Sequence, residues 1–280
     1  MCNGELLEAF EPTTRANDIF CATAAKSGQT WLLTLLHHLK TRGRDPDFGG
    51  VGLRAAAPWL ELPMKIKTGD PYDTPTRLAQ LEALEDPRIF KMHVLWNEIP
   101  RLAGSGAKVI TISRDPRDLP YSMFRHIQGL KPDNRPPNFS GDFDEYFETW
   151  LEFGYVFKFG RSFWPHRADP DLLWLRFEDL KAQLAVETRK IVDFAGWELT
   201  DEDIDRALPL VDFTYMQENE RAKLFINAKR SWADGHRFFR EGGVGKNRAQ
   251  LSADQEARII ARGREEFEPE CFDFLFSQGV

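Results

Sequence analysis

Basic and hydroxyl-bearing residues gather around one glycine near the N-terminus. Lys26 and Ser27 precede Gly28, and Thr30 follows it at the start of an apolar periodic run. A turn of small residues before a helix aims backbone N–H groups and the positive end of the helix dipole at one point, which favours an anion. In the nucleotide P-loop, G-x-x-x-x-G-K-S/T, the lysine follows the glycine and the hydroxyl group holds magnesium. Here the lysine comes first, so an anion site without that magnesium ligand is predicted.

Three further regions contain residues that could bind an anion or take up a proton. His93 ends a short apolar run that also contains Lys91. An unperturbed imidazole has a pKa near about 6.5 and can take up a proton at neutral pH. Arg114 follows another apolar run, and Arg240 stands in a stretch with four glycines, residues 234–245. A planar guanidinium suits bidentate binding of phosphate, so these residue types indicate a base and several anion ligands.

All these residues lie next to apolar runs or turns that alternate with amphipathic segments. Strands are predicted at residues 18–24, 88–93, 108–113 and 172–177, and helices at residues 30–39, from 114 through 122, and at 180–195. The alternation predicts an α/β fold, a single domain over residues 1–280 with a central parallel sheet flanked by helices. Ligands bind at the carboxyl ends of such strands. The loop-rich segments 43–69, 131–141 and 234–245 are predicted to form lids and pocket walls.

The composition is that of a globular protein of enzyme size. Its 280 residues are 42% hydrophobic and 29% charged, with a formal net charge of −7. This charge argues against nucleic acid or an anionic membrane as a partner. Cys2, Cys21 and Cys271 show no metal-ligand spacing and suggest a reducing compartment. No apolar run reaches the length of about 18 residues that a membrane span needs, so a cytoplasmic protein is expected.

Taken in order, the motif segments resemble those of the cytosolic-type sulfotransferases. A-K-S-G-Q-T-W at residues 25–31 resembles P-K-S-G-T-T-W, and K-M-H at 91–93 resembles K-T-H. R-D-P-R-D-L-P-Y-S at 114–122 fits R-N/D-x-x-D-x-x-x-S. F-E-D-L at 177–180 is similar to Y-E-D-L/M, D-F-T-Y-M at 212–216 to S-F-x-x-M, and F-F-R-E-G-G-V-G at 238–245 to F-x-R-K-G-x-x-G. The resemblance runs from about residue 18 to residue 256.

This resemblance implies a P-loop-like phosphosulfate-binding loop with 3′-phosphoadenylyl sulfate (PAPS) as donor, 3′-phosphoadenosine 5′-phosphate (PAP) as product, and no metal. The donor-binding residues carry over to Lys26, Ser27, Gly28, Gln29, Thr30, Trp31, Arg114, Ser122, Phe177, Phe213, Met216, Phe239, Arg240, Glu241 and Gly242. Three of them depart from the family, because Gln29 replaces a threonine, Phe177 a tyrosine and Glu241 a lysine. At Glu241 only the backbone N–H is expected to bind the 3′-phosphate.

The resemblance also implies catalytic roles for four residues. His93 is the general base that takes the proton of the acceptor. Lys26 and Lys91 stabilise charge on the sulfuryl and leaving-phosphate oxygens, and Ser122 tunes Lys26. The implied reaction is an in-line displacement at sulfur that releases PAP. It needs no metal because a sulfuryl group carries less negative charge than a phosphoryl group.

The acceptor site is expected where the family builds its pocket walls. The corresponding aromatic residues are Phe20, Trp59, Trp96, Phe124 and Tyr155. Such walls suit a flat small-molecule acceptor, a phenol or another alcohol. Residues 154–159 lack a histidine that borders the family's acceptor site, so an amine acceptor stays open. The family's dimer motif is not recognisable, and a homodimer stays open as well.

Two other interpretations remain open. A P-loop small-molecule kinase would use ATP and magnesium, but it needs the Gly-Lys-Ser/Thr order that this chain lacks. A non-catalytic protein that binds PAP or PAPS would keep the fold without turnover, and the replacements at Gln29, Phe177 and Glu241 agree with it. The presence of His93 together with both lysines favours an enzyme.

Overall fold

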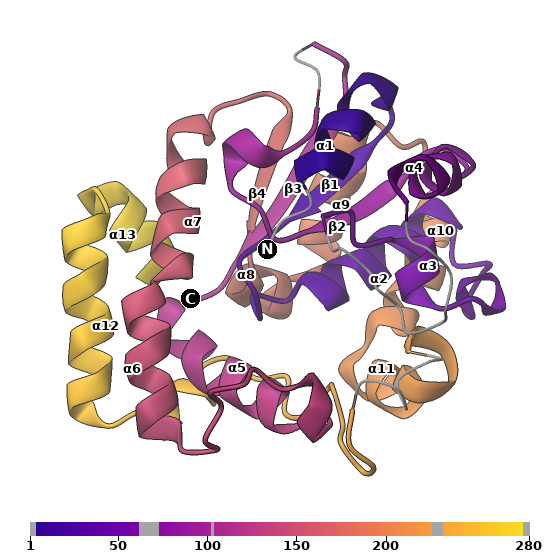
Figure 1. Ribbon diagram of the computed structural model, residues 1–280. Coiled ribbons are helices and arrows are strands. Elements are labelled where there is room, and N and C mark those ends of the chain that lie inside the picture. The colour runs from indigo at the N-terminus through magenta and orange to yellow at the C-terminus, as the bar shows by residue number, and fades with distance from the viewer. Residues whose placement is uncertain (1–3, 62–72, 102–103, 226–231, 277–280) are drawn as a thin grey trace.

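The centre of the molecule is a fully parallel sheet. The computed structural model describes residues 4–61, 73–101, 104–225 and 232–276, so residues 62–69 of the predicted loop 43–69 lie outside the described part (Figure 1). The four strands lie in the order β2-β1-β3-β4 and all pair in parallel. Their bounds are β1 Ile19–Ala22, β2 Ile89–Met92, β3 Lys108–Ser113 and β4 Leu172–Arg176. The predicted α/β domain around a parallel sheet is confirmed.

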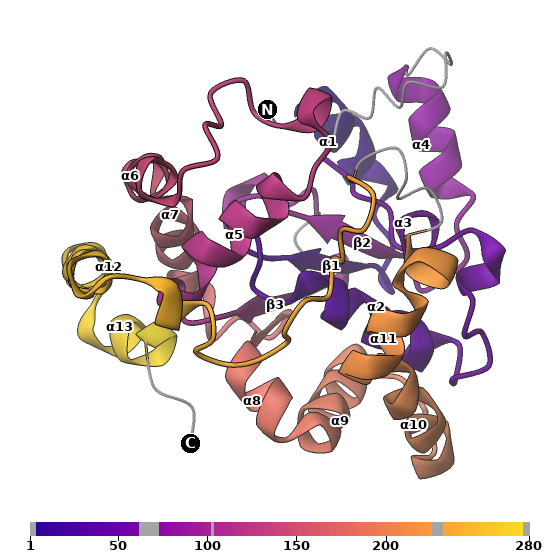
Figure 2. The same ribbon diagram turned by 90° about the horizontal axis from the view of Figure 1, so that it is seen from below.

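Helices connect the strands and cover both faces of the sheet. In chain order they are α1 Gly4–Phe10, α2 Gln29–Lys40, α3 Leu53–Ala56, α4 Thr74–Glu82, α5 Leu119–Gln128, α6 Phe143–Phe153, α7 Tyr155–Phe163, α8 Phe177–Ala182, α9 Leu184–Ala195, α10 Asp201–Ala207, α11 Phe213–Asn219, α12 Ala253–Glu266 and α13 Pro269–Phe276. Figure 2 shows α8 and α9 on one side of the sheet and α1 and α5 on the other. Among the described helices, none is long and apolar enough to cross a bilayer.

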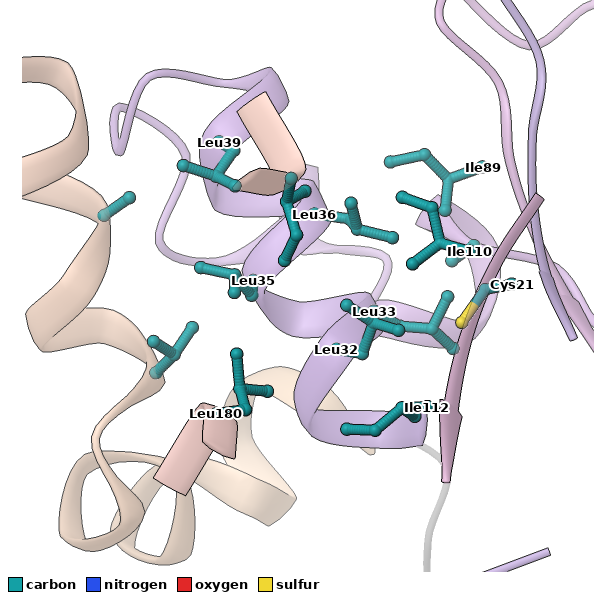
Figure 3. Packing of buried hydrophobic residues seen from close by; sticks show 14 of the residues in the cluster. Cys21, Leu32, Leu33, Leu35, Leu36, Leu39, Ile89, Ile110, Ile112 and Leu180 are labelled. Atoms are coloured by element: carbon teal, nitrogen blue, oxygen red, sulfur yellow. The ribbon is translucent and has the colours of Figure 1, made fainter. Parts of the chain in front are cut away.

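The sheet face toward α2 is packed with aliphatic side chains. Cys21 of β1 and Ile110 and Ile112 of β3 share a buried cluster with Leu32 and Leu36 of α2 (Figure 3). The leucines of α2 recur at helical spacing, so one stripe of the helix is buried against the sheet. This packing holds the first turn of α2 just beyond the end of β1.

Phe20 lies on the opposite face, because successive side chains of a strand alternate in direction. Its ring is fully buried between α1 and β2, with centroid distances of 6.2 Å to Phe10 and 5.6 Å to Phe90. The predicted place of Phe20 in an acceptor pocket is therefore wrong. Phe20 is a core residue of the second face of the sheet.

Two predicted helices differ from the observed ones. After β3, a 3-10 turn at Pro116–Asp118 precedes α5, which begins at Leu119. Pro120 is then the second residue of α5, where a missing N–H costs no hydrogen bond. The predicted helix at 180–195 is divided into α8 and α9 at Gln183, whose φ of −138° and ψ of 52° are not helical.

Candidate active site

A cavity of about 820 Å³ opens where the strands end. Residues that follow each of the four strands contribute to its wall. The sequence-predicted residues that line it are Lys26, Gly28, Gln29, Thr30, Trp31, Trp59, Lys91, His93, Arg114, Ser122, Tyr155, Phe177, Phe213, Met216, Phe239, Arg240, Glu241 and Gly242. The fold thus brings the predicted catalytic residues and nearly all predicted donor-binding residues to one cavity.

Besides Phe20, three other predicted residues lie off the cavity wall. Ser27 is fully buried, and its Oγ has no hydrogen-bond partner among the described residues. Trp96 stacks on His166, with ring centroids 4.4 Å apart. Phe124 is buried in an aromatic cluster, 5.3 Å from Phe143. The predicted contributions of Trp96 and Phe124 to the acceptor wall are wrong, because both rings pack against helices behind it.

The turn between β1 and α2 is shaped for a close approach to the backbone. The backbone at Lys26 and Gly28 has positive φ angles, 72° and 109°, in the left-handed region. A Cβ at position 28 would lie 2.8 Å from the Phe177 ring, so only glycine fits there. No described side chain caps the first turn of α2, which begins at Gln29. The N–H groups of that turn are therefore left for an external anion.

Gln29, predicted as a donor ligand, has a structural role. Its side-chain amide donates to the carbonyl oxygens of Cys21, at 2.8 Å, and Met92, at 2.7 Å. These two carbonyls lie near the ends of β1 and β2. The glutamine thus ties the two strands together beneath the cavity, which a threonine, with a single hydroxyl donor, could not do in the same way.

Lys26 carries its amino group into a crowded basic region. Its Nζ lies 4.5 Å from the centroid of the Phe238 ring. Burial, together with the charges of Arg240, Lys91 and Arg114, lowers the pKa of Lys26 to about 7. An anion that entered the cavity would relieve this repulsion.

His93 is held as a neutral imidazole with one nitrogen available. Its Nδ1 lies 2.7 Å from the carbonyl oxygen of Thr23. A carbonyl only accepts, so Nδ1 carries the hydrogen and Nε2 keeps its lone pair. The main-chain carbonyl of His93 accepts a hydrogen bond of 2.7 Å from the Tyr155 hydroxyl. Burial, with Lys91 and Lys26, lowers the pKa of His93 to about 3, so the imidazole is in the form that can take up a proton.

Lys91 and His93 share one buried carboxylate. Glu61 Oε1 accepts from the main-chain N–H of His93 at 2.6 Å and from the indole N–H of Trp59. Lys91 Nζ lies 4.0 Å from the centroid of the Trp59 ring, within the range of a cation–π contact. Burial lowers the pKa of Lys91 to about 8, while the Glu61 carboxylate opposes this shift. The motifs did not indicate Glu61, although it follows Trp59 by two residues.

Arg114 is oriented by groups from two distant segments. Its Nη2 donates to the carbonyl oxygen of Gly243 at 2.9 Å and lies 3.2 Å from the Asp118 carboxylate. The guanidinium lies 4.5 Å over the Phe177 ring. Its Nε is buried and has no hydrogen-bond partner in the described part of the chain. A fixed guanidinium with a donor to spare is suited to an anionic ligand.

The C-terminal wall of the cavity is closely packed against α11. A Cβ at Gly242, whose φ is 60°, would lie 2.3 Å from the Phe213 ring. The Phe239 carbonyl accepts a hydrogen bond of 2.6 Å from the Gln217 side chain. Glu241 also lines the cavity, but its residue is exposed to solvent. Solvent screens the repulsion that this carboxylate would exert on a phosphate.

The cavity wall contains residues that no motif indicated. They include His126 and Met123 of α5, Trp150 of α6 and Lys181 of α8. Lys181 Nζ lies 5.9 Å from the Trp31 ring centroid. The helical spacing of residues 119–127 was the signal that could have found the α5 residues. Within the described ranges, no group of three or more His, Cys, Asp or Glu side chains could hold a metal ion.

Comparisons with known proteins agree with this geometry. Residues 16–268 match the family described as the sulfotransferase domain, so the chain belongs to the sulfotransferase family. It is 28% identical to human Sulfotransferase 4A1 over 201 residues, which cover 70% of this chain and 65% of the human protein. The fold is similar to that of mouse sulfotransferase SULT7A1 complexed with PAP, with a TM-score of 0.72, 21% identity and coverage of 98% and 93% of the two chains. Retinol dehydratase in complex with retinol and PAP gives a TM-score of 0.71 at 22% identity, with coverage of 91% and 82%.

Proposed function

We propose that this chain is a PAPS-dependent sulfotransferase, which transfers a sulfuryl group to a hydroxyl or amine group of a small-molecule acceptor and releases PAP. The observation that carries the proposal is the arrangement of His93, Lys26 and Lys91 on one cavity wall. The hydrogen bond from His93 to the Thr23 carbonyl leaves an imidazole nitrogen available as a general base. The two lysines supply positive charge beside it.

The residues present fit a nucleotide with two anionic ends. The uncapped first turn of α2 and Lys26 suit the phosphosulfate end. Arg114, with its buried Nε, suits the 3′-phosphate. The rings of Trp31 and Phe177, 5.6 Å apart, offer apolar surface for a purine. PAP in the structures of SULT7A1 and retinol dehydratase supports this choice of donor.

Each catalytic residue has a defined task in the proposal. When bound, PAPS supplies the sulfuryl group. His93 takes the acceptor proton at Nε2, and Lys26 and Lys91 hold positive charge near the oxygens that gain negative charge. Ser122 also lines the cavity, and its proposed task is to tune Lys26. The low pKa of His93 in the protein alone reflects burial first and the charges of the two lysines second, and an anion between the lysines offsets their part of the shift.

Several broader predictions accompany this function. The described cysteines, Cys21 and Cys271, are free buried thiols, which supports a reducing, cytoplasmic location. A small-molecule acceptor fits a cavity of about 820 Å³. The homodimer, and the absence of nucleic acid and membrane partners, remain predictions from the sequence.

The proposal is tested by incubating the protein with sulfur-labelled PAPS and a panel of phenols, alcohols and amines. Wild type should form labelled product, and His93→Ala should lower the rate by about 10²- to 10⁴-fold while PAP binding, measured by calorimetry, stays within threefold. PAP binding without transfer to any acceptor would identify a non-catalytic binding protein. Magnesium-dependent ATP turnover without sulfuryl transfer would identify a kinase instead.

A further inference from the structure

Gln29 connects the expected anion site to the segment that carries the base. It is the first residue of α2, and its side chain reaches the ends of β1 and β2. Only 4% of the residue is exposed to solvent. Both of its partners are carbonyl oxygens, which only accept, so the amide nitrogen faces them and the amide oxygen faces away. One buried side chain thus joins the first turn of α2 to two neighbouring strand ends.

The amide oxygen of Gln29 is buried and has no hydrogen-bond partner among the described residues. An unpaired buried acceptor is unfavourable, and an apolar or shorter residue would avoid this cost. Packing alone therefore does not account for a glutamine at this position. The function of the side chain has to be sought in its two N–H groups and in what their acceptors do.

The peptide group between Met92 and His93 is held on both sides. Its carbonyl oxygen, on Met92, accepts from Gln29 at 2.7 Å and from the main-chain N–H of Thr23 at 3.2 Å. Its N–H, on His93, donates to Glu61 Oε1 at 2.6 Å. Because a peptide group is planar, these bonds fix the direction in which the chain leaves β2. They also fix the point from which the His93 side chain starts.

The same bonds bear on the hydrogen that His93 carries. Its Nδ1 donates to the carbonyl of Thr23 at 2.7 Å, and this bond selects the tautomer with a lone pair on Nε2. Gln29 holds the carbonyl of Met92, just before His93, and that of Cys21, two residues before Thr23. The glutamine thus fixes the separation of the two strand ends that form the imidazole bond. If this separation changed, Nδ1 would lose its acceptor and the hydrogen could move to Nε2.

We propose that Gln29 is a positioning residue for the base: by tying Cys21 to Met92, it keeps His93 in the tautomer whose Nε2 can take up a proton. The inference rests on the proposed function and gives a new task to a residue that the resemblance placed among the donor ligands. Gln29 touches no reacting atom in this assignment. Its loss should therefore lower kcat and leave the affinity for PAP nearly unchanged.

The first test measures the tautomer of His93 by nitrogen-15 NMR of the histidine side chains at pH 7. The signals of His93 are identified as those that disappear in His93→Ala. In wild type, the Nδ1–H form should exceed the Nε2–H form at least about tenfold, and in Gln29→Met this ratio should fall at least about threefold. Methionine has a similar length and no N–H donor. An unchanged ratio in Gln29→Met would overturn the proposal.

The second test separates kcat from donor binding with labelled PAPS and an acceptor that wild type sulfates. In Gln29→Met, kcat should fall at least about tenfold, because the base is misplaced. The dissociation constant of PAP should stay within threefold, because the main-chain N–H groups of the first turn remain. Equal losses of kcat and PAP affinity would overturn the assignment, since they would indicate a damaged donor loop.

Gln29→Thr introduces the residue of the family motif and makes the test stricter. A threonine has one short hydroxyl and cannot donate to both carbonyls, so this variant should resemble Gln29→Met in its tautomer ratio and kcat. Wild-type values of both quantities in Gln29→Thr would overturn the proposal. The two variants differ in size, so a shared effect would not result from the volume of the side chain.

Thr34→Val is the matched control for a lost hydrogen bond in the same helix. Thr34 is fully buried, and its hydroxyl donates to the Thr30 carbonyl of α2 at 2.8 Å. Valine has nearly the same shape, so the tautomer ratio and kcat should remain those of wild type. A fall in the ratio as large as that in Gln29→Met would mean a general loosening of α2 and would overturn the assignment. Unfolding temperatures above the assay temperature would show that the variants are folded.

The NMR measurement also separates this inference from the proposed function. The tautomer ratios are measured without substrate and do not depend on transfer. A protein with the expected ratios but without sulfuryl transfer to any acceptor would contradict the proposed function alone.

Discussion

Lys26 is held where a positive charge is disfavoured, and this has a measurable consequence. Its pKa of about 7 means that most molecules carry a neutral Lys26 at pH 8. A phosphate beside the amino group favours the charged form and raises the pKa. Binding of PAP at pH 8 should therefore take up a proton, and the affinity should fall as the pH rises from 7 to 9.

Calorimetry at pH 8 in two buffers with different ionisation enthalpies measures this proton uptake. Wild type should take up about one proton, to which Lys91, with a pKa of about 8, also contributes. Lys26→Arg keeps its charge at every pH in this range, so its uptake should be clearly smaller. Equal uptake by the two proteins would show that Lys26 does not titrate at the donor site.

Glu61 should act on catalysis through Lys91. Glu61→Gln keeps an oxygen that can accept from the Trp59 and His93 N–H groups, but removes the negative charge that raises the pKa of Lys91. The pKa of Lys91 should then fall below about 8, and the alkaline limb of the pH profile of kcat/KM should move to lower pH.

The control variant should shift the pKa of Lys91 in the opposite direction. Arg54 lowers the pKa of Lys91, so Arg54→Gln should move the alkaline limb to higher pH. A purely structural effect of Glu61→Gln would reduce kcat/KM equally at every pH. If the alkaline limb of the kcat/KM profile lay at the same pH in wild type and both variants, the effect of Glu61 on the pKa of Lys91 would be refuted.

The residues that the sequence revealed share a simple position. Lys26, His93 and Arg114 each stand one to four residues beyond a strand, and the carboxyl ends of parallel strands meet at one edge. His126 does not follow a strand but lies within α5. Its place on the cavity depends on where α5 begins, and a proline near that start obscured the helix. For Phe20 the prediction was wrong. The resemblance placed it in the acceptor pocket, but the alternation of side chains along β1 turns it into the core on the opposite face of the sheet.

At the scale of elements, one carboxylate joins the start of α5 to the C-terminal loop. Asp118 is buried and accepts from the main-chain N–H groups of Gly245, at 2.8 Å, and Arg248, at 2.9 Å. It also lies 3.2 Å from Arg114. The loop and the arginine are thus set by the same side chain, which fixes both sides of the expected 3′-phosphate site.

Asp118→Asn should loosen this connection. The amide has one acceptor oxygen and no charge, so PAP affinity should fall at least about tenfold. Hydrogen exchange at the Gly245 and Arg248 amides should become faster. Asp115→Asn is a matched control, because Asp115 is also buried beside an arginine, 2.6 Å from Arg117, but contacts neither amide. Similar exchange at both amides in the two variants would contradict the proposed tie.

The elements themselves were largely predictable from periodicity. The strand predicted at residues 108–113 coincides with β3, since a continuous apolar run is typical of a strand buried on both faces. The break at Gln183 was not predictable, because the apolar pattern continues through it and the main chain alone departs from the helix. Boundaries depend on such local conformations more than on hydrophobic pattern.

At the scale of the whole molecule, the cavity joins segments from both ends of the chain. Lys26 follows the first strand, whereas Arg240 belongs to residues 232–252, which cross the end of the sheet before α12 in Figure 2. A ligand that contacts both segments must stabilise the fold as a whole, because it binds the native state and not the unfolded chain. The unfolding temperature therefore reports donor binding even where no acceptor is known.

PAP at a concentration 100 times its dissociation constant should raise the unfolding temperature by about 5 °C for a chain of 280 residues. Adenosine 5′-monophosphate at the same concentration lacks the 3′-phosphate and should give a clearly smaller shift, since Arg114 then gains no partner. In Arg114→Ala the shifts with the two nucleotides should become more similar, because one of the groups that distinguish the nucleotides is gone. Equal shifts of the wild-type unfolding temperature with the two nucleotides would refute the proposed 3′-phosphate site, which Arg114 forms where it contacts the Gly243 carbonyl.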